Sequence, residues 1–193
     1  MNQKTKKLAV MGILTALSIV FVLFVHFPLF PGAPFLEYDP ADIPILIGAF
    51  AYGPLAGILM TVAVSVIQGI TVSVSSGYYG VIMHVIATST LVIVASSIYK
   101  ARHTRKGAVI GLACGTLAMA GVMMVANHFI TPLFMTVPVE VVDAMLVPLI
   151  LPFNLLKAGI NSVLTFVVYK SVSRYIIKGE VFGKKKTALD NQA

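Results

Sequence analysis

Charged side chains are scarce in this chain. Only 11% of its 193 residues are Asp, Glu, Lys or Arg, whereas 58% are hydrophobic, and a soluble domain typically carries about 25% charged residues. So few charges leave too little polar surface to face water, which excludes a soluble globular protein and predicts an all-α integral membrane protein. The hydrophobic runs are continuous rather than alternating, so a transmembrane β-barrel is not expected.

Motifs for catalysis, metal binding and nucleotide binding are missing. The sequence has no H-E-x-x-H motif, no Cys/His cluster, no nucleophile elbow, no Walker A loop and no dinucleotide-binding glycine fingerprint. Its single cysteine, Cys114, can form no intrachain disulfide. These absences argue against an enzyme, a resident cofactor or metal, and a built-in ATPase. The net charge of +7 comes from residues that flank apolar spans, so it does not indicate a nucleic-acid partner.

No small-residue cleavage site follows the first apolar run. Lys4–Lys7 precede the run Leu8–Phe27, and prolines follow from Pro28 onward. We therefore interpret this segment as a retained first span rather than a signal peptide. Further spans are expected at Gly80–Tyr99, Gly107–Phe129 and about Pro152–Ile177. Between the last two, Thr131–Pro148 is expected to form a loop with a short helix near Val139–Met145.

The basic residues set the orientation. Apart from Lys157, they lie in three clusters at residues 4–7, 100–106 and 170–186. Because such clusters remain on the cytoplasmic side, an even number of spans must separate the first two. We therefore divide the uncharged stretch Ile43–Val74 at Gly53-Pro54, a helix stop-and-restart signal. The result is six transmembrane helices with both termini cytoplasmic, one of them only about 12 residues long and so sheltered by protein. We expect one membrane domain over residues 1–178 and a disordered basic tail over 179–193.

Acidic residues gather on the side expected to face outward. Five of the seven acids lie in the two longer external loops: Glu37, Asp39, Asp42, Glu140 and Asp143. Lys157 is the only base on that side, roughly 7 Å below the outer end of the last span. A lone ammonium within a membrane costs roughly 2.5 kcal/mol or more, so it indicates a functional site. Asn154, Lys157 and Asn161 follow the spacing i, i+3, i+7 and form one polar stripe.

Two explanations of the stripe remain open. In the first, the two asparagines make interhelical hydrogen bonds and Lys157 pairs with an external acid such as Glu37. In the second, which we favour, the stripe faces a polar cavity. Asn127, near the outer end of the span Gly107–Phe129, allows the same two explanations. The adjacent His128 is expected to cap or pack rather than to bind a metal.

Small residues recur at helical spacing in two places. The pattern G-xxx-G-xxx-G over residues 107–115 is expected to let a neighbouring helix approach closely within the bundle. Ala9, Gly12 and Ala16 form a similar face on the first span. That face either packs inside the bundle or docks on another protein.

Three segments resemble the riboflavin-specific substrate-binding (S) subunits of energy-coupling factor (ECF) vitamin transporters. They are E-Y-D-P-A-D-I-P at 37–44, Y-G-P-L-A-G at 52–57 and P-F-N-L-L-K-A-G-I-N at 152–161. The resemblance extends over nearly the whole chain, from Lys6 to about Ile177. It implies a six-helix bundle in the bacterial plasma membrane that binds riboflavin from outside with high affinity. It also implies a transmembrane coupling subunit and two ABC-type ATPases as partners, which accounts for the missing Walker motif.

The resemblance further implies roles for individual residues. In this family, polar residues of the fifth and sixth helices hold the flavin ring, and the first external loop closes over it. With the stripe included, the ligand-binding residues are expected to be Leu36, Glu37, Tyr38, Asn127, Asn154, Lys157 and Asn161. The family's A-x-x-x-A docking motif falls on Gly12 to Ala16, with glycine in place of the first alanine. Ala9, Gly12 and Ala16 are then the expected contact with the coupling subunit.

The chemistry of a flavin agrees with these side chains. The ring has a polar edge of carbonyls, ring nitrogens and an N–H, to which asparagine offers a donor and an acceptor and Lys157 offers donors. Riboflavin is expected as a transported ligand, not a cofactor, and the acidic loops disfavour its phosphorylated forms. Three alternatives stay open: an S subunit for another vitamin or for FMN, a stand-alone proton-coupled carrier, and a membrane-embedded enzyme. For the last two, Lys157 facing Glu37 or Asp143 is the only acid–base candidate.

Overall fold

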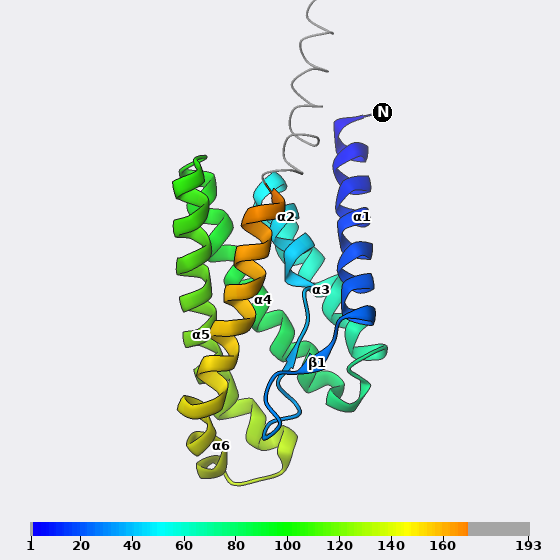
Figure 1. Ribbon diagram of the computed structural model, residues 1–193. Coiled ribbons are helices and arrows are strands. Elements are labelled where there is room, and N and C mark those ends of the chain that lie inside the picture. Colours follow the sequence, from blue (N-terminus) through cyan, green and yellow to red (C-terminus); the bar gives the residue numbers. More distant parts are fainter. Residues whose placement is uncertain (1, 170–193) are drawn as a thin grey trace, which may run out of the picture.

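The structure, a computed structural model, describes residues 2–169, which form a bundle of helices (Figure 1). In chain order the helices are α1 (Gln3–Phe24), α2 (Asp42–Tyr52), α3 (Pro54–Ile70), the short 3-10 turn η1 (Val74–Ser76), α4 (Gly77–Ala101), α5 (Arg105–Met135) and α6 (Val139–Met145). A π turn, η2 (Leu146–Ile150), leads into a last helix over residues 151–169. The expected all-α architecture gains one antiparallel pair, β1 (Phe27–Pro28) with β2 (Glu37–Tyr38). The tail expected at 179–193 lies outside the described residues.

Four helical segments are long and apolar enough to cross a membrane, judged by length and composition. They are Gln3–Phe24, Val74–Ala101, Arg105–Met135 and Val139–Tyr169. The two shorter apolar helices are α2 and α3. The helical membrane architecture is therefore confirmed, whereas the count of six spans requires α2 and α3 to cross as well and stays a prediction.

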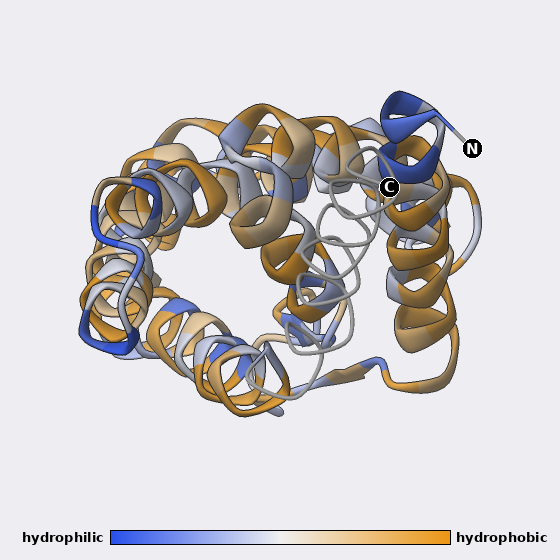
Figure 2. Cartoon of the chain, turned by 90° about the horizontal axis from the view of Figure 1, so that it is seen from above, coloured by the Kyte–Doolittle hydropathy of each residue, from blue (hydrophilic) through white to orange (hydrophobic). Residues whose placement is uncertain are grey.

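The first two basic clusters share one end of the bundle. Figure 1 shows the start of α1 and the turn between α4 and α5 at one end, and the β1–β2 segment with α6 at the other. Seen from the first end, in Figure 2, hydrophilic residues mark the start of α1, while the helices are predominantly hydrophobic. The loops that carry the acidic residues Glu37, Asp39, Asp42, Glu140 and Asp143 therefore lie at the end opposite the first two basic clusters.

α2 is enclosed by the rest of the bundle. Every residue from 42 to 50 is buried, as expected for a short helix sheltered by protein. The predicted break at Gly53-Pro54 is also confirmed. Gly53 has φ 95°, a conformation that glycine adopts without steric cost, and Pro54 occupies the first turn of α3, where its missing N–H is not needed.

α5 is longer than the sequence predicted. The predicted span ended at Phe129, but the helix continues to Met135 with Pro132 inside it. A proline in a helix removes one backbone hydrogen bond, yet the turns on either side remain helical. The helix stops at Thr136, which has a left-handed φ of 55° and donates its N–H to the carbonyl of Pro132. The boundary was wrong because the end of the helix is set by this cap, not by the proline.

The two small-residue patterns have different surroundings. Between α4 and α5, a Cβ added to Gly111 would lie 2.6 Å from the carbonyl oxygen of Ala95, so this pattern permits the close approach that was predicted. On α1, a Cβ added to Gly12 would meet no heavy atom of the described residues within 4 Å outside its own stretch of helix. Ala9, Gly12 and Ala16 are all exposed. The α1 face is therefore not packed inside the bundle.

Candidate ligand-binding site

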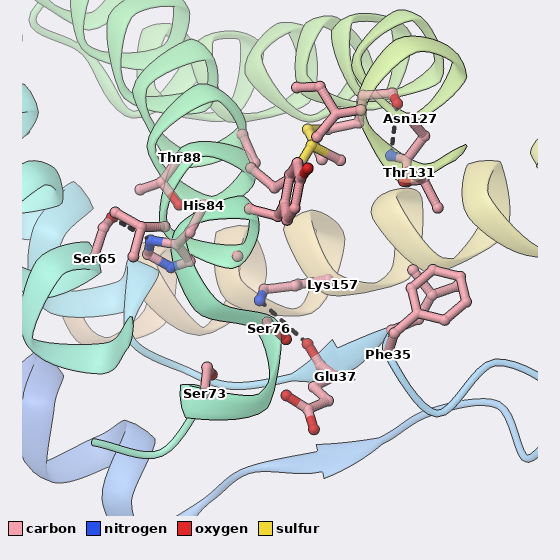
Figure 3. A pocket seen from close by; sticks show the side chains of 18 of the residues that line it. Phe35, Glu37, Ser65, Ser73, Ser76, His84, Thr88, Asn127, Thr131 and Lys157 are labelled. Atoms are coloured by element: carbon pink, nitrogen blue, oxygen red, sulfur yellow. Dashed lines mark hydrogen bonds between the residues drawn. The ribbon is translucent and has the colours of Figure 1, made fainter. Parts of the chain in front are cut away.

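A cavity lies between α3, α4, α5 and the last helix, beside the loop that carries β2 (Figure 3). It holds about 950 Å³ of empty space, part of which is open solvent at the mouth. Of the predicted ligand-binding residues, those that line it are Leu36, Glu37, Asn127, Asn154 and Lys157. Tyr38 and Asn161 are buried behind the wall.

Lys157 pairs with an acid of the first loop. Its Nζ donates to Asp39 Oδ2 over 2.7 Å and to the backbone carbonyl of Glu37 over 3.3 Å. Only 10% of the Lys157 side chain and 2% of the Asp39 side chain are exposed. The ion-pair explanation therefore holds for Lys157, with Asp39 in place of the suggested carboxylate of Glu37. The lysine also lines the cavity, so both explanations apply to this residue.

Asn161, one helical turn after Lys157, also holds the first loop. Its Nδ2 donates to the backbone carbonyl of Asp39 over 3.1 Å and to Asp42 Oδ2 over 3.0 Å. Its Oδ1 accepts from the Tyr38 hydroxyl over 3.1 Å. Burial, followed by the negative charges of the two aspartates, raises the pKa of Tyr38, so the phenol keeps its proton and remains a donor. We call Tyr38, Asp39, Asp42, Lys157 and Asn161 the loop anchor.

Two of the acids expected in the external loops are buried. Asp39 is 1% exposed and Asp42 is fully buried. Asp42 opens α2, where the positive end of the helix dipole favours a carboxylate, and its Oδ1 accepts from Thr88 over 2.7 Å. Burial acts to raise the pKa of Asp39, but the neighbouring Lys157 ammonium outweighs it and holds that pKa below its ordinary value. Neither acid faces solvent, because their partners come from helices far along the chain.

Asn127 and Asn154 bond within their own helices instead. Asn127 Nδ2 donates to the Met123 carbonyl over 2.7 Å, and its Oδ1 accepts from Thr131 over 2.8 Å. Asn154 Nδ2 donates to the Ile150 carbonyl over 2.8 Å. Among residues 2–169, neither asparagine makes the interhelical bonds of the first explanation. An amide has two N–H groups and an oxygen with two lone pairs, so both side chains retain capacity on the cavity side.

The rest of the lining is largely apolar. Methionine and phenylalanine side chains contribute most of it: Met83, Met119, Met123, Phe35, Phe134 and Phe153. Near the α6 end, Ala33 and Leu36 of the first loop form a separate buried cluster with Val142, Ile150 and Phe153. This cluster joins the loop to α6 and the last helix, so the same loop is held by polar bonds on one side and by apolar packing on the other.

Two histidine–carboxylate pairs lie at the outer surface. His128 Nδ1 is 2.6 Å from Asp143 Oδ1 and links α5 to α6, in agreement with the predicted packing role. His26 Nε2 is 2.6 Å from Glu37 Oε2. Within residues 2–169, no group of three His, Cys, Asp or Glu side chains is placed to hold a metal ion.

A further polar wall was missed by the sequence reasoning. Gln68, Ser73, Ser76 and His84, from α3, η1 and the start of α4, also line the cavity. These residues are uncharged and scattered through apolar stretches, where single Ser, Gln and His residues are common. The available signal was the density of polar residues between Gln68 and Ser76.

Comparison with known proteins adds four matches. A family model described as "ECF transporter, substrate-specific component" matches residues 6–169. The chain is 31% identical over 182 residues to the "Riboflavin transporter FmnP" of Bacillus subtilis, covering 90% of this chain and 95% of that protein. It is 30% identical over 187 residues to the "Riboflavin transporter RibU" of Lactococcus lactis subsp. cremoris, covering 93% and 91%. A solved structure of the S component of a bacterial ECF transporter has a TM-score of 0.79 and 25% identity, covering 90% of this chain and 99% of that chain.

Proposed function

The chain belongs to the family of ECF transporter substrate-specific components, and from this we propose that it is the high-affinity riboflavin-binding subunit of an ATP-driven vitamin importer. The observation that carries the proposal is the cavity lined by Asn127, Asn154 and Lys157. Relatives that match over most of the chain bear the name riboflavin transporter, which supports the same ligand.

The polar edge of the flavin ring is assigned to these three side chains. Lys157 has three N–H donors, of which two go to Asp39 and Glu37, so the third remains for a ring carbonyl or nitrogen. The amides of Asn127 and Asn154 read the alternating donors and acceptors of the same edge. Met119, Met123 and the other apolar lining residues suit the dimethylbenzene end. In this assignment Tyr38 and Asn161 act on the ligand indirectly, by holding the loop.

The loop at residues 36–38 is proposed to close the cavity from the outside. Six spans, with α2 and α3 crossing and both termini cytoplasmic, place this loop on the extracellular side of a bacterial plasma membrane. The first two basic clusters, at the other end of the bundle, support this orientation. A single membrane domain over residues 1–178 belongs to the same proposal.

The partners are a transmembrane coupling subunit and two ABC-type ATPases, docked through Ala9, Gly12 and Ala16. The exposure of this face supports the assignment. Ala16→Leu should block assembly with the coupling subunit and leave riboflavin binding intact, as measured by co-purification and flavin titration. Ala113→Leu is the matched control, because it adds the same bulk to an exposed alanine of α5. Loss of binding and assembly together in Ala16→Leu would show that this face is part of the core.

The absorption spectrum of the purified protein tests the ligand directly. The protein should carry a yellow flavin, or bind added riboflavin tightly after washing. A ligand panel read by thermal shift compares riboflavin with FMN and other vitamins, since a true ligand stabilises the folded state by mass action. FMN should stabilise less, because Lys157 in the cavity wall is already paired with Asp39. A different vitamin with the largest shift would replace riboflavin in the proposal.

A stand-alone proton-coupled carrier is the second candidate. The observation that favours it is the buried grouping of two aspartates with Lys157 and His84, in which His84 Nε2 lies 3.9 Å from Asp42 Oδ1. Uptake into vesicles separates the two functions. Transport that continues without ATP and collapses with the proton gradient would support the carrier, and transport that requires the coupling subunit and ATP would support the importer.

A further inference from the structure

A buried serine of α1 holds the end of the first loop (residues 25–41). The inner face of α1 consists of Met11, Leu14, Ser18 and Val22, and Ser18 is the only polar residue among them. It is fully buried, and its hydroxyl donates to the backbone carbonyl of Ala41 over 2.9 Å, across 23 positions of the chain. This hydrogen bond ties the end of the first loop back to the helix that precedes the loop.

The residue that Ser18 holds is connected to the cavity. Ala41 donates its N–H to Asp39 Oδ1 over 3.1 Å, and Asp39 Oδ2 accepts from Lys157. Hydrogen bonds therefore lead from Ser18 through Ala41 and Asp39 to the lysine in the cavity wall. None of the described residues that line the cavity belongs to α1, so Ser18 acts on the cavity through the loop and not by contact with a ligand.

Ser18 has a second acceptor within reach. Its hydroxyl lies 3.2 Å from the carbonyl of Leu14 in the same helix, but a serine hydroxyl has a single hydrogen. The shorter bond, to Ala41, uses that hydrogen while the loop is in place. When the loop moves away, the hydrogen can pass to Leu14 in a common intrahelical bond, so α1 keeps no unsatisfied donor.

The bond to Ala41 differs in this respect from the loop anchor. Lys157 and Asp39 are buried opposite charges, and separating them leaves each charge without its partner. Ser18 and Ala41 are uncharged, and the net contribution of a neutral hydrogen bond is modest because its groups find other partners. The first loop is therefore held firmly by the last helix and reversibly by α1.

We propose that Ser18 is a latch that holds the first loop over the cavity and slows the escape of a bound ligand. It is a positioning residue, because it touches the loop and not the ligand. The statement about ligand escape rests on the proposed function, whereas the statement about the loop does not. Loss of the latch should raise the dissociation rate of the ligand without slowing its association, because a loosened loop leaves the mouth of the cavity accessible.

Hydrogen exchange of the first loop tests the latch without a ligand. In the purified full-length protein with Ser18→Ala, the backbone N–H groups of residues 36–43 should exchange about threefold to tenfold faster than in the wild type. Ser18→Cys nearly preserves the side-chain volume but offers only a weak donor, so it should behave like Ser18→Ala. Ser96→Ala is the matched control, because Ser96 is a buried serine that bonds to Val92 within its own helix. It should leave exchange of the loop at the wild-type rate.

Stopped-flow release of riboflavin tests the consequence for the ligand. Ser18→Ala and Ser18→Cys should each release riboflavin about threefold to tenfold faster than the wild type. Ser96→Ala should release it at the wild-type rate, since Ser96 lies outside the cavity lining.

Each outcome decides a different question. Wild-type exchange of the loop in Ser18→Ala or in Ser18→Cys, or equal acceleration in Ser96→Ala, would overturn the latch while leaving riboflavin as the ligand. Faster exchange with unchanged release would show that the loop does not retain the ligand, which also overturns the proposal. If neither Ser18 variant folds, unprotected exchange of residues 36–43 in the wild-type protein would overturn it, and protected exchange would support it. If the wild-type protein binds no riboflavin, the proposed function fails, and hydrogen exchange still decides whether Ser18 holds the loop.

Discussion

Asn154 and Asn161 are the same residue type on the same stripe of the same helix, yet they lie in different environments. Asn161 uses both ends of its amide on the first loop and α2, through Tyr38, Asp39 and Asp42. Asn154 donates only to the carbonyl four residues earlier and otherwise lines the cavity. Asn161 therefore has a structural role, whereas Asn154 is free to bind a ligand. Lys157 lies between them and has both roles.

This comparison separates stability from affinity. A residue of the loop anchor stabilises the fold through partners that cannot be satisfied elsewhere, whereas a cavity residue can be changed at little cost to the fold. Paired measurements of thermal unfolding and of riboflavin affinity can therefore test the assignment residue by residue.

The largest effect is expected at Lys157. Lys157→Met leaves Asp39 buried without its counter-charge, and breaking such a pair costs about 3–5 kcal/mol. The melting temperature should fall by roughly 10 °C, and riboflavin binding should be lost with it. The double variant Lys157→Met/Asp39→Asn removes both charges and should recover part of the stability. A single variant that melts like the wild type would show that the ion pair does not hold the loop.

Asn161→Leu should have the next largest effect on stability. It leaves Asp42 Oδ2 and the Tyr38 hydroxyl without a partner that the structure records, and unsatisfied buried groups cost about 1–3 kcal/mol each. Thermal unfolding should show the loss directly. Riboflavin should still bind to the folded fraction but dissociate faster, because the loop over the cavity is held less firmly. Stopped-flow dissociation measures this rate.

Asn154→Leu makes the identical chemical change about two helical turns earlier and should give the opposite result. The free energy of unfolding should change by less than about 1 kcal/mol, since one intrahelical bond is lost. Riboflavin affinity should fall by about tenfold or more because a direct contact is removed. If Asn154→Leu and Asn161→Leu lower stability equally and have the same riboflavin affinity, the two asparagines do not have different roles.

The smallest effect is the change of stability with pH between neutral pH and about pH 4 that Asp39 contributes. Its pKa is lower in the folded protein than its ordinary value, so its contribution to stability is complete above the unfolded pKa of about 3.9. That contribution is lost as the pH falls through the folded pKa. When the pH is lowered from 7, protonation of Asp39 should therefore not lower the melting temperature until about pH 4. Asp39→Asn should be less stable at neutral pH, and the gap should narrow in acid.

Local signals in the sequence predicted much of the fold. Charge clusters, apolar lengths and Gly53-Pro54 predicted the helices and their break, and the enclosed α2 followed from its short length. The end of α5 was missed because Pro132 is tolerated inside that helix. These features depend on residues close together in the chain, which is why they can be read without a structure.

The site was predictable only in part. The cavity positions of Asn127, Asn154 and Lys157 were found from helical spacing, since a polar stripe on an apolar helix needs a polar neighbour. The burial of Asp39 and Asp42 was not found, because their position next to prolines and a loop is typical of solvent-exposed acids. Gln68 and His84 carried no charge and no motif, so only the packing of α3 against α4 reveals them as one wall.

The loop anchor also dictates an order of events during synthesis. Tyr38 and Asp39 are made 118 to 123 residues before Lys157 and Asn161, a delay on the order of ten seconds at typical elongation rates. For that interval two carboxylates that end up buried have none of these partners from the last helix. The nascent chain must therefore keep its first loop near water until the last helix arrives, and the cavity exists only once nearly the entire protein has been made.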